Sequence, residues 1–197
     1  MRRKRIFDII ASLIGLAVLF PVFLLIALTV KFTSGGPVFF RQFRVGQFSK
    51  LFLIVKFRTM VINAEATGAQ VSSGDDPRIT AVGRVLRKYK LDELPQLFNV
   101  LKGEMSFVGP RPEVPRYVDA YKEEYRDILT ARPGITDFAS LEFKDENELL
   151  NNIEDPERKY LEEIMPVKIA FYKKYIKEQS LKTDLTLILK TLMKIIR

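Results

Sequence analysis

The chain has 197 residues, a net charge of +8, no cysteine and no histidine. This length allows one domain of ordinary size. The lack of cysteine excludes disulfides and thiolate chemistry, and the lack of histidine removes the commonest general base. Any catalysis must therefore use carboxylates, lysine, tyrosine, hydroxyl groups or a hard metal ion.

Residues 9–30 contain no charged side chain, and basic residues flank this run on both sides. About 20 such residues span a bilayer, but Lys and Arg favour the cytoplasmic side, and a straight crossing would place only one flank there. Pro21 lies near the middle of the run, where proline removes a helical hydrogen bond. We therefore predict a re-entrant membrane helix in residues 1–33, broken near Pro21, that enters and leaves by the same face.

This segment has two alternative interpretations. A straight, bitopic crossing is the main alternative. A cleaved signal peptide is disfavoured, because the run exceeds the about 7–15 apolar residues of a signal sequence and no small-residue cleavage site follows it.

Residues 34–197 are predicted to form a compact cytoplasmic domain of the α+β class, mainly helical. Residues 38–45 and 51–57 are rich in Phe, Val, Ile and Leu, which predicts a small β-hairpin. Residues 80–90 have the pattern of an amphipathic helix with a cationic face. Residues 180–197 form a basic amphipathic helix that can lie in the membrane interface or pack on the domain's own core. The sequence leaves both arrangements open.

The best chemical candidates are Asp92 and Glu93, at the start of a helix predicted over residues 91–102. Carboxylates at a helix N-terminus face free N–H groups and the positive end of the helix dipole, which should keep Asp92 ionised. The same setting attracts phosphate. An ionised carboxylate there can hold a divalent metal or attack phosphorus. The simpler alternative is that Asp92 is an N-cap and Glu93 a first-turn acid.

Three arginines are candidates for phosphate contacts: Arg58 ends the second strand, Arg111 lies between two prolines, and Arg132 precedes a Pro-Gly turn. Arginine is suited to bidentate phosphate contacts, so the set suits a pyrophosphate site, although each arginine alone could be a surface residue or an ion-pair partner. The sequence has no phosphate-binding P-loop, no dinucleotide-binding glycine motif and no zinc-ligand spacing.

Several motifs occur in a fixed order along the chain. They are the segments KRIFD at 4–8, PVFF at 37–40, KFRTM at 56–60, DPRIT at 76–80, LDELPQLFNVLKGEMSFVGPRP at 91–112 and RPGIT at 132–136. This series resembles the bacterial sugar transferases that start lipid-linked glycan assembly, the monotopic phosphoglycosyl transferases or polyprenyl-phosphate hexose-1-phosphate transferases. The resemblance runs from about residue 4 to residue 136 and is weaker beyond.

The resemblance implies a reaction at the cytoplasmic face of the bacterial inner membrane. A sugar-1-phosphate would move from a UDP-sugar to undecaprenyl phosphate, with release of UMP. Asp92 would form an aspartyl-phosphosugar intermediate and bind Mg²⁺, and Glu93 would assist by positioning or by handling a proton. Arg58 and Arg111 match family positions beside the phosphates. The expected partners are the UDP-sugar, polyprenyl phosphate and membrane lipid, and a homodimer is left open.

The chain also departs from the family pattern. Phe20-Pro21 stands where many members have Ser-Pro, Lys144 falls near the place of a family arginine, and Tyr172 stands where an aspartate is common. These changes put the identity of the sugar in doubt more than the reaction.

Other functions remain open from the sequence alone. One is a transferase with another nucleotide-activated donor, and another is a non-catalytic membrane platform that recruits glycan-assembly partners. Nucleic-acid binding is disfavoured, because the apolar segment would hold the chain at a membrane and the aromatic residues do not alternate with the basic runs.

Overall fold

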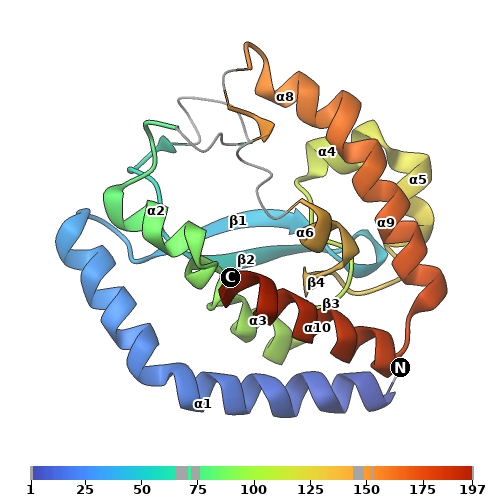
Figure 1. The fold of residues 1–197 in the computed structure, drawn as a ribbon, viewed down its shortest axis with the longest axis horizontal. Coiled ribbons are helices and arrows are strands. Elements are labelled where there is room, and N and C mark those ends of the chain that lie inside the picture. Colours follow the sequence, from blue (N-terminus) through green and yellow to red (C-terminus); the bar gives the residue numbers. More distant parts are fainter. Residues whose placement is uncertain (1, 65–70, 72–75, 144–148, 152, 197) are drawn as a thin grey trace.

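The computed structural model describes residues 2–64, 71, 76–143, 149–151 and 153–196. The helices are α1 (Arg2–Thr33), α2 (Ala81–Lys88), α3 (Gln96–Lys102), α4 (Pro115–Ala120), α5 (Lys122–Ile128), α6 (Phe138–Glu142), α8 (Pro156–Lys159), α9 (Met165–Glu178) and α10 (Leu181–Ile196). Single 3-10 turns form η1 (Gln47–Ser49) and η3 (Leu91–Glu93), and η4 (Tyr160–Ile164) is a short π-helical segment. The strands are β1 (Phe39–Val45), β2 (Leu51–Phe57), β3 (Ser106–Val108) and β4 (Gly134–Thr136). The mainly helical α+β class is confirmed (Figure 1).

The predicted hairpin is confirmed. β1 and β2 pair antiparallel, from Phe39 opposite Phe57 to Val45 opposite Leu51. The buried side chain of Asn99 in α3 joins the outer edge of β2: its Oδ1 accepts from the Val55 N–H at 3.1 Å and its Nδ2 donates to the Leu53 carbonyl at 2.8 Å. These bonds fix β2 against the helix that follows Asp92.

α1 is one continuous helix of 32 residues that contains Pro21. Figure 1 shows it as two arms that meet at a bend. The predicted break is therefore a bend and not an interruption, because a proline removes one hydrogen bond while the neighbouring turns keep theirs. It is long and apolar enough to cross a membrane, and only 17% of its most apolar window is buried, unlike the core helix of a soluble protein.

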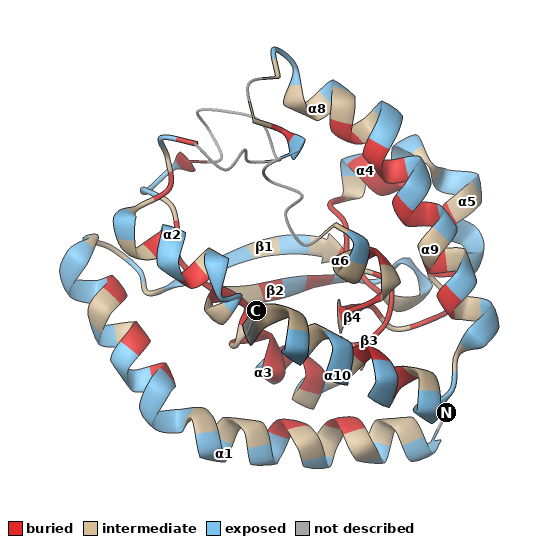
Figure 2. Ribbon diagram, viewed as in Figure 1, coloured by how far each residue is buried: buried red, intermediate tan, exposed pale blue. Residues whose placement is uncertain are grey.

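Both arms of α1 contact the same domain. Near its start, the Lys4 ammonium donates to the Val108 carbonyl at 2.9 Å and pairs with Asp184 of α10 at 2.6 Å. Near its end, Phe23, Ile26 and Val30 pack in one cluster with residues of β2 and α2. The remaining apolar side chains of α1 are largely exposed (Figure 2).

A second, parallel pair of short strands was not predicted. β3 pairs with β4, with Ser106 opposite Gly134 and Val108 opposite Thr136. Two glycines allow the segments to lie this close: a Cβ on Gly109 would lie 2.2 Å from the Arg132 carbonyl oxygen, and one on Gly134 would lie 2.1 Å from the Gly109 nitrogen. The segment that carries Arg111 is therefore fixed to the turn after Arg132.

α10 packs one face on the domain, which is one of the two arrangements that the sequence left open. Asp184 and Leu187 are buried against the domain, whereas Leu185, Leu189 and Leu192 remain exposed. One face thus packs on the protein, and an apolar stripe remains on the other.

Candidate active site

Asp92 and Glu93 lie in the η3 turn between α2 and α3, and both side chains are more than nine-tenths buried. The prediction that Asp92 caps a helix is wrong. α3 begins only at Gln96, with Pro95 at its N-cap, and η3 is a separate tight turn with Lys90 at its own N-cap. The short i→i+3 bonds of this turn place Asp92 inside it, where its side chain does not cap α3.

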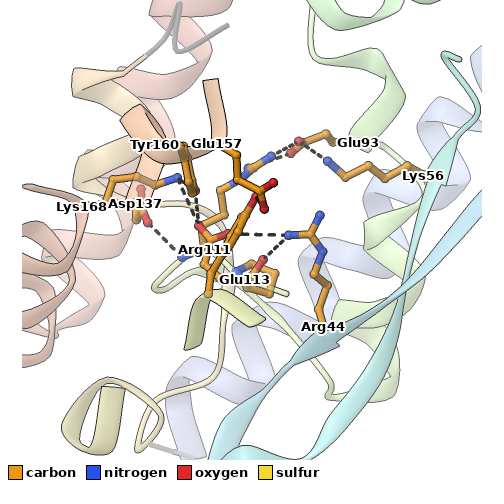
Figure 3. Close-up of polar contacts among 11 residues, drawn as sticks. Arg44, Lys56, Glu93, Arg111, Glu113, Asp137, Glu157, Tyr160 and Lys168 are labelled. Atoms are coloured by element: carbon orange, nitrogen blue, oxygen red, sulfur yellow. Dashed lines mark hydrogen bonds and ion pairs between the residues drawn. The ribbon is translucent and has the colours of Figure 1, made fainter. Parts of the chain in front are cut away.

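Glu93 is held by two cations. Its Oε1 lies 2.8 Å from the Lys56 ammonium of β2 and 2.6 Å from the Arg111 guanidinium. Burial would raise the pKa of Glu93, but Arg111 and Lys56 outweigh burial and hold that pKa well below its ordinary value. Glu93 is therefore an ionised group tied to its neighbours (Figure 3).

Asp92 has different surroundings. Within the described ranges its carboxyl group makes no hydrogen bond and no ion pair. Burial raises its pKa and the Glu93 charge adds to this, while Lys56 and Arg87 oppose the rise. The sequence argument that a helix terminus would lower this pKa fails, because Asp92 is not at the start of α3 and burial has the larger effect.

The structure brings one of the predicted arginines to the acidic pair. Arg111 contacts Glu93 directly. Arg58 is buried, and its Nη2 donates to the carbonyl and hydroxyl oxygens of Ser34, next to the end of α1. Arg132 is half-buried, and its side chain makes no hydrogen bond with the described residues. Lys144 lies outside the described residues.

Two cations of the site were not among the predicted site residues. Lys56 points from β2 to Glu93, and burial lowers its pKa while Glu93 opposes the change. Arg87 on α2 donates to the Thr59 hydroxyl at 2.9 Å and acts on Asp92 by its charge. The cationic face predicted for residues 80–90 could have indicated Arg87 as a site residue. For Lys56 the indication in the sequence was weaker, namely its position two residues before Arg58.

A buried polar cluster lies behind Arg111 and also escaped the sequence analysis. Glu113 contacts Lys168 of α9 at 3.2 Å and accepts a hydrogen bond from the Tyr160 hydroxyl at 2.9 Å. Burial would raise the pKa of Glu113, but Lys168 and Arg44 outweigh it and lower the pKa. Tyr172, noted in the sequence as a departure from the family, is fully buried in the adjoining core.

The acidic side chains of the site determine whether it could hold a metal ion. No group of three or more acidic side chains gathers in the part of the chain that the structure describes. Mg²⁺ commonly uses only one or two protein carboxylates and completes its shell with substrate phosphates and water. Because Glu93 is paired with two cations, Asp92 is the carboxylate of the pair that has no bonded partner among the described residues and could be a metal ligand.

Comparison with known proteins identifies the family of the chain. The model of the family described as bacterial sugar transferase matches residues 1–197. The chain belongs to this family of bacterial sugar transferases. The family places it among the enzymes that transfer sugar phosphates.

Three relatives illustrate the range of the family. The exopolysaccharide production protein ExoY of Sinorhizobium fredii is 35% identical over 96% of this chain and 83% of its own length. The UDP-glucose:undecaprenyl-phosphate glucose-1-phosphate transferase of Caulobacter vibrioides is 41% identical over 96% of this chain and 68% of its own length. The UDP-N-acetylgalactosamine-undecaprenyl-phosphate N-acetylgalactosaminephosphotransferase of Aeromonas hydrophila is 47% identical over 70% of this chain, and the match covers 33% of that longer protein.

Proposed function

We propose that the protein transfers a sugar-1-phosphate from a UDP-sugar to undecaprenyl phosphate, as the first membrane step in assembly of a glycan. The observation that carries this proposal is the unequal environment of two adjacent acids. Glu93 is bound by Lys56 and Arg111, whereas the buried Asp92 carboxylate has no bonded partner among the described residues and experiences the charges of Lys56 and Arg87. Such a carboxylate among cations suits attack on a phosphorus atom whose charge those cations reduce.

The reaction would proceed in two displacements at one phosphorus atom. A carboxylate oxygen of Asp92 attacks the β-phosphorus of the donor, and the bond from that phosphorus to the UMP oxygen breaks. An oxygen of undecaprenyl phosphate then attacks the same phosphorus, and the Asp92 carboxylate leaves. Arg111 would hold the diphosphate, and Glu93 would hold Arg111 and Lys56 in place. Mg²⁺, held by Asp92 and the substrate phosphates, would supply further neutralisation of charge.

The membrane arrangement that we propose is a re-entrant α1 at the cytoplasmic face of the inner membrane. The hydrocarbon core of a bilayer is about 30 Å thick, so a straight crossing would separate the ends of α1 by at least this distance. The contact of Lys4 with Asp184 and the packing of Val30 in the same domain support a helix that returns to its starting face. The exposed stripe of Leu185, Leu189 and Leu192 on α10 supports docking of that helix on the membrane surface.

The test is to incubate the full chain in detergent with Mg²⁺, undecaprenyl phosphate and a panel of UDP-sugars, and to follow the release of UMP. We expect Asp92→Asn to abolish release, and Asp119→Asn, the same change at an exposed acid of α4, to have no effect. Without the acceptor, the peptide that contains Asp92 should gain the mass of one sugar phosphate. Normal turnover by Asp92→Asn, together with no adduct on the wild type, would exclude this mechanism. Membrane binding with no turnover for any donor would favour the platform function instead.

A further inference from the structure

Three successive residues of the Arg111 segment are held by three different elements. The Arg111 N–H donates to Asp137 Oδ2 at 3.1 Å, and Asp137 also caps α6. The Pro112 carbonyl accepts from Arg44 of β1 at 3.2 Å. The Glu113 carboxylate lies 3.2 Å from Lys168 of α9. The backbone around Arg111 is thus fixed from several sides (Figure 3).

The contact with α9 is the most deeply buried of these. The side chains of Lys168 and Glu113 are 3% and 4% exposed. The Tyr160 hydroxyl joins them, because it donates to Glu113 at 2.9 Å and accepts from Lys168 at 2.7 Å. A buried ion pair often adds little stability compared with apolar residues of the same size, but it allows few alternative geometries. A role in position is therefore a better explanation of this cluster than a role in stability.

The other end of the segment reaches the active site. The Arg111 guanidinium contacts Glu93 at 2.6 Å, while prolines at 110 and 112 restrict the backbone on both sides. A continuous series of contacts therefore connects Lys168 on α9, through Glu113 and the Arg111 backbone, to Glu93. The Arg111 side chain is 32% exposed, so part of it is in contact with solvent.

We propose that Lys168 and Glu113 are positioning residues that fix the Arg111 guanidinium for a nucleoside diphosphate group. Neither residue touches substrate, and both act through the segment 111–113. The inference rests on the proposed function, because it assigns to Arg111 the diphosphate of the UDP-sugar. It also gives α9, which lies more than fifty residues further along the chain, a defined part in donor binding.

The first experiment removes the charges of Lys168 and Glu113 together, so that neither member of this buried pair is left without the other. Arg44, which lies 3.7 Å from Glu113, keeps its hydrogen bond to the Pro112 carbonyl. The double variant Lys168→Met/Glu113→Gln is compared with Lys177→Met, a change at an exposed lysine of the same helix. We expect the double variant to lose about a hundredfold in kcat/KM for the UDP-sugar, as misplacement of about 1 Å can cause. Lys177→Met should match the wild type. Tyr160→Phe, which removes only the bridging hydroxyl, gives a milder test that keeps the shape of the core, and we expect about a tenfold loss.

The decisive readout is a double-mutant cycle with Arg111→Lys, which removes the planar guanidinium. If the cluster acts through Arg111, the double variant Lys168→Met/Glu113→Gln should lower kcat/KM less than about threefold in the Arg111→Lys background. The proposal would be overturned if the cluster variant lowered kcat/KM by the same factor in the wild-type and the Arg111→Lys backgrounds. It would also be overturned if both cluster variants left kcat/KM unchanged. UDP binding, measured by titration calorimetry, provides the same cycle without turnover. A failure of the wild type to release UMP would therefore refute the transfer reaction alone, while the binding cycle would still decide the role of the cluster.

Discussion

The two adjacent acids of the site should respond in opposite ways when each is replaced by its amide. Glu93→Gln leaves Lys56 and Arg111 without the anion that both now contact. Removal of one partner from a buried ion pair costs about 3–5 kcal/mol. The Lys56 and Arg111 side chains are 17% and 32% exposed, so both keep some access to water. The lower end of that range, about 3 kcal/mol, is therefore the expected loss in the free energy of unfolding.

For a protein of this length, 1 kcal/mol shifts Tm by about 2–4 °C, so Glu93→Gln should lower Tm by about 6–12 °C. Asp92→Asn should leave Tm unchanged or raise it. The Asp92 carboxyl makes no hydrogen bond or ion pair with the described residues, and burial disfavours its ionised form. The amide therefore loses no contact and removes a desolvated charge.

Calorimetric unfolding in one detergent at pH 7 measures both variants under the same conditions, with Asp119→Asn as a surface control. An Asp92→Asn variant that loses as much stability as Glu93→Gln would show that Asp92 also has a bound partner. An unchanged Tm for Glu93→Gln would show that the two cations do not depend on Glu93. Either result would refute the division of the pair into one acid bonded to cations and one acid without a bonded partner among the described residues.

Three further outcomes follow from the packing and charges. Burial would raise the pKa of Glu113, but neighbouring cations hold this pKa below its ordinary value of 4.5. The ionised Glu113 therefore stabilises the fold above pH 4.5, and this stabilisation is lost as the pH falls through the folded-state pKa. Glu113→Gln should therefore lower Tm at pH 7, and melts followed by circular dichroism should show the difference from wild type closing in acid. Gly134→Ala would place a Cβ 2.1 Å from the Gly109 nitrogen and should cost about 3 kcal/mol in urea unfolding, whereas no loss would mean that β3 and β4 can separate freely. Since the chain has no cysteine, Arg3→Cys and Thr33→Cys can each be labelled alone with a membrane-impermeant maleimide, and labelling from opposite faces would contradict a re-entrant α1.

Local patterns in the sequence were sufficient for the elements that depend on neighbouring residues. The hairpin was placed to within one residue, because its strands are adjacent and both are rich in β-forming side chains. The β3–β4 pair was missed, since three-residue strands carry no periodic pattern and Ser106 meets Gly134 only in the folded chain. The bend of α1 was expected from Pro21, but its continuity through that residue was not.

The sequence predicted those site residues that belong to a recognisable motif. The acidic pair and Arg111 stood out in one continuous block of sequence, and the structure places Arg111 against Glu93. The pKa direction of Asp92 could not be obtained in this way, because burial depends on how β2 and α2 close over the η3 turn. The pairing of Glu113 with Lys168 was equally out of reach, since it depends on the packing of α9.

The charge of the site gives a physical reason for a divalent ion in the proposed reaction. Four cations, Lys56, Arg87, Lys90 and Arg111, act on the two carboxylates of Asp92 and Glu93, which leaves about two positive charges when both acids are ionised. A diphosphate brings about two negative charges, so the loaded site would be close to neutral while an anionic carboxylate must still approach phosphorus. Because Lys56 and Arg111 are already paired with Glu93, a divalent ion that accompanies the substrate would supply the positive charge at the reacting phosphate. Removal of divalent ions with a chelator should then stop UMP release without reducing membrane binding, and turnover that continues in excess chelator would show that the fixed cations suffice.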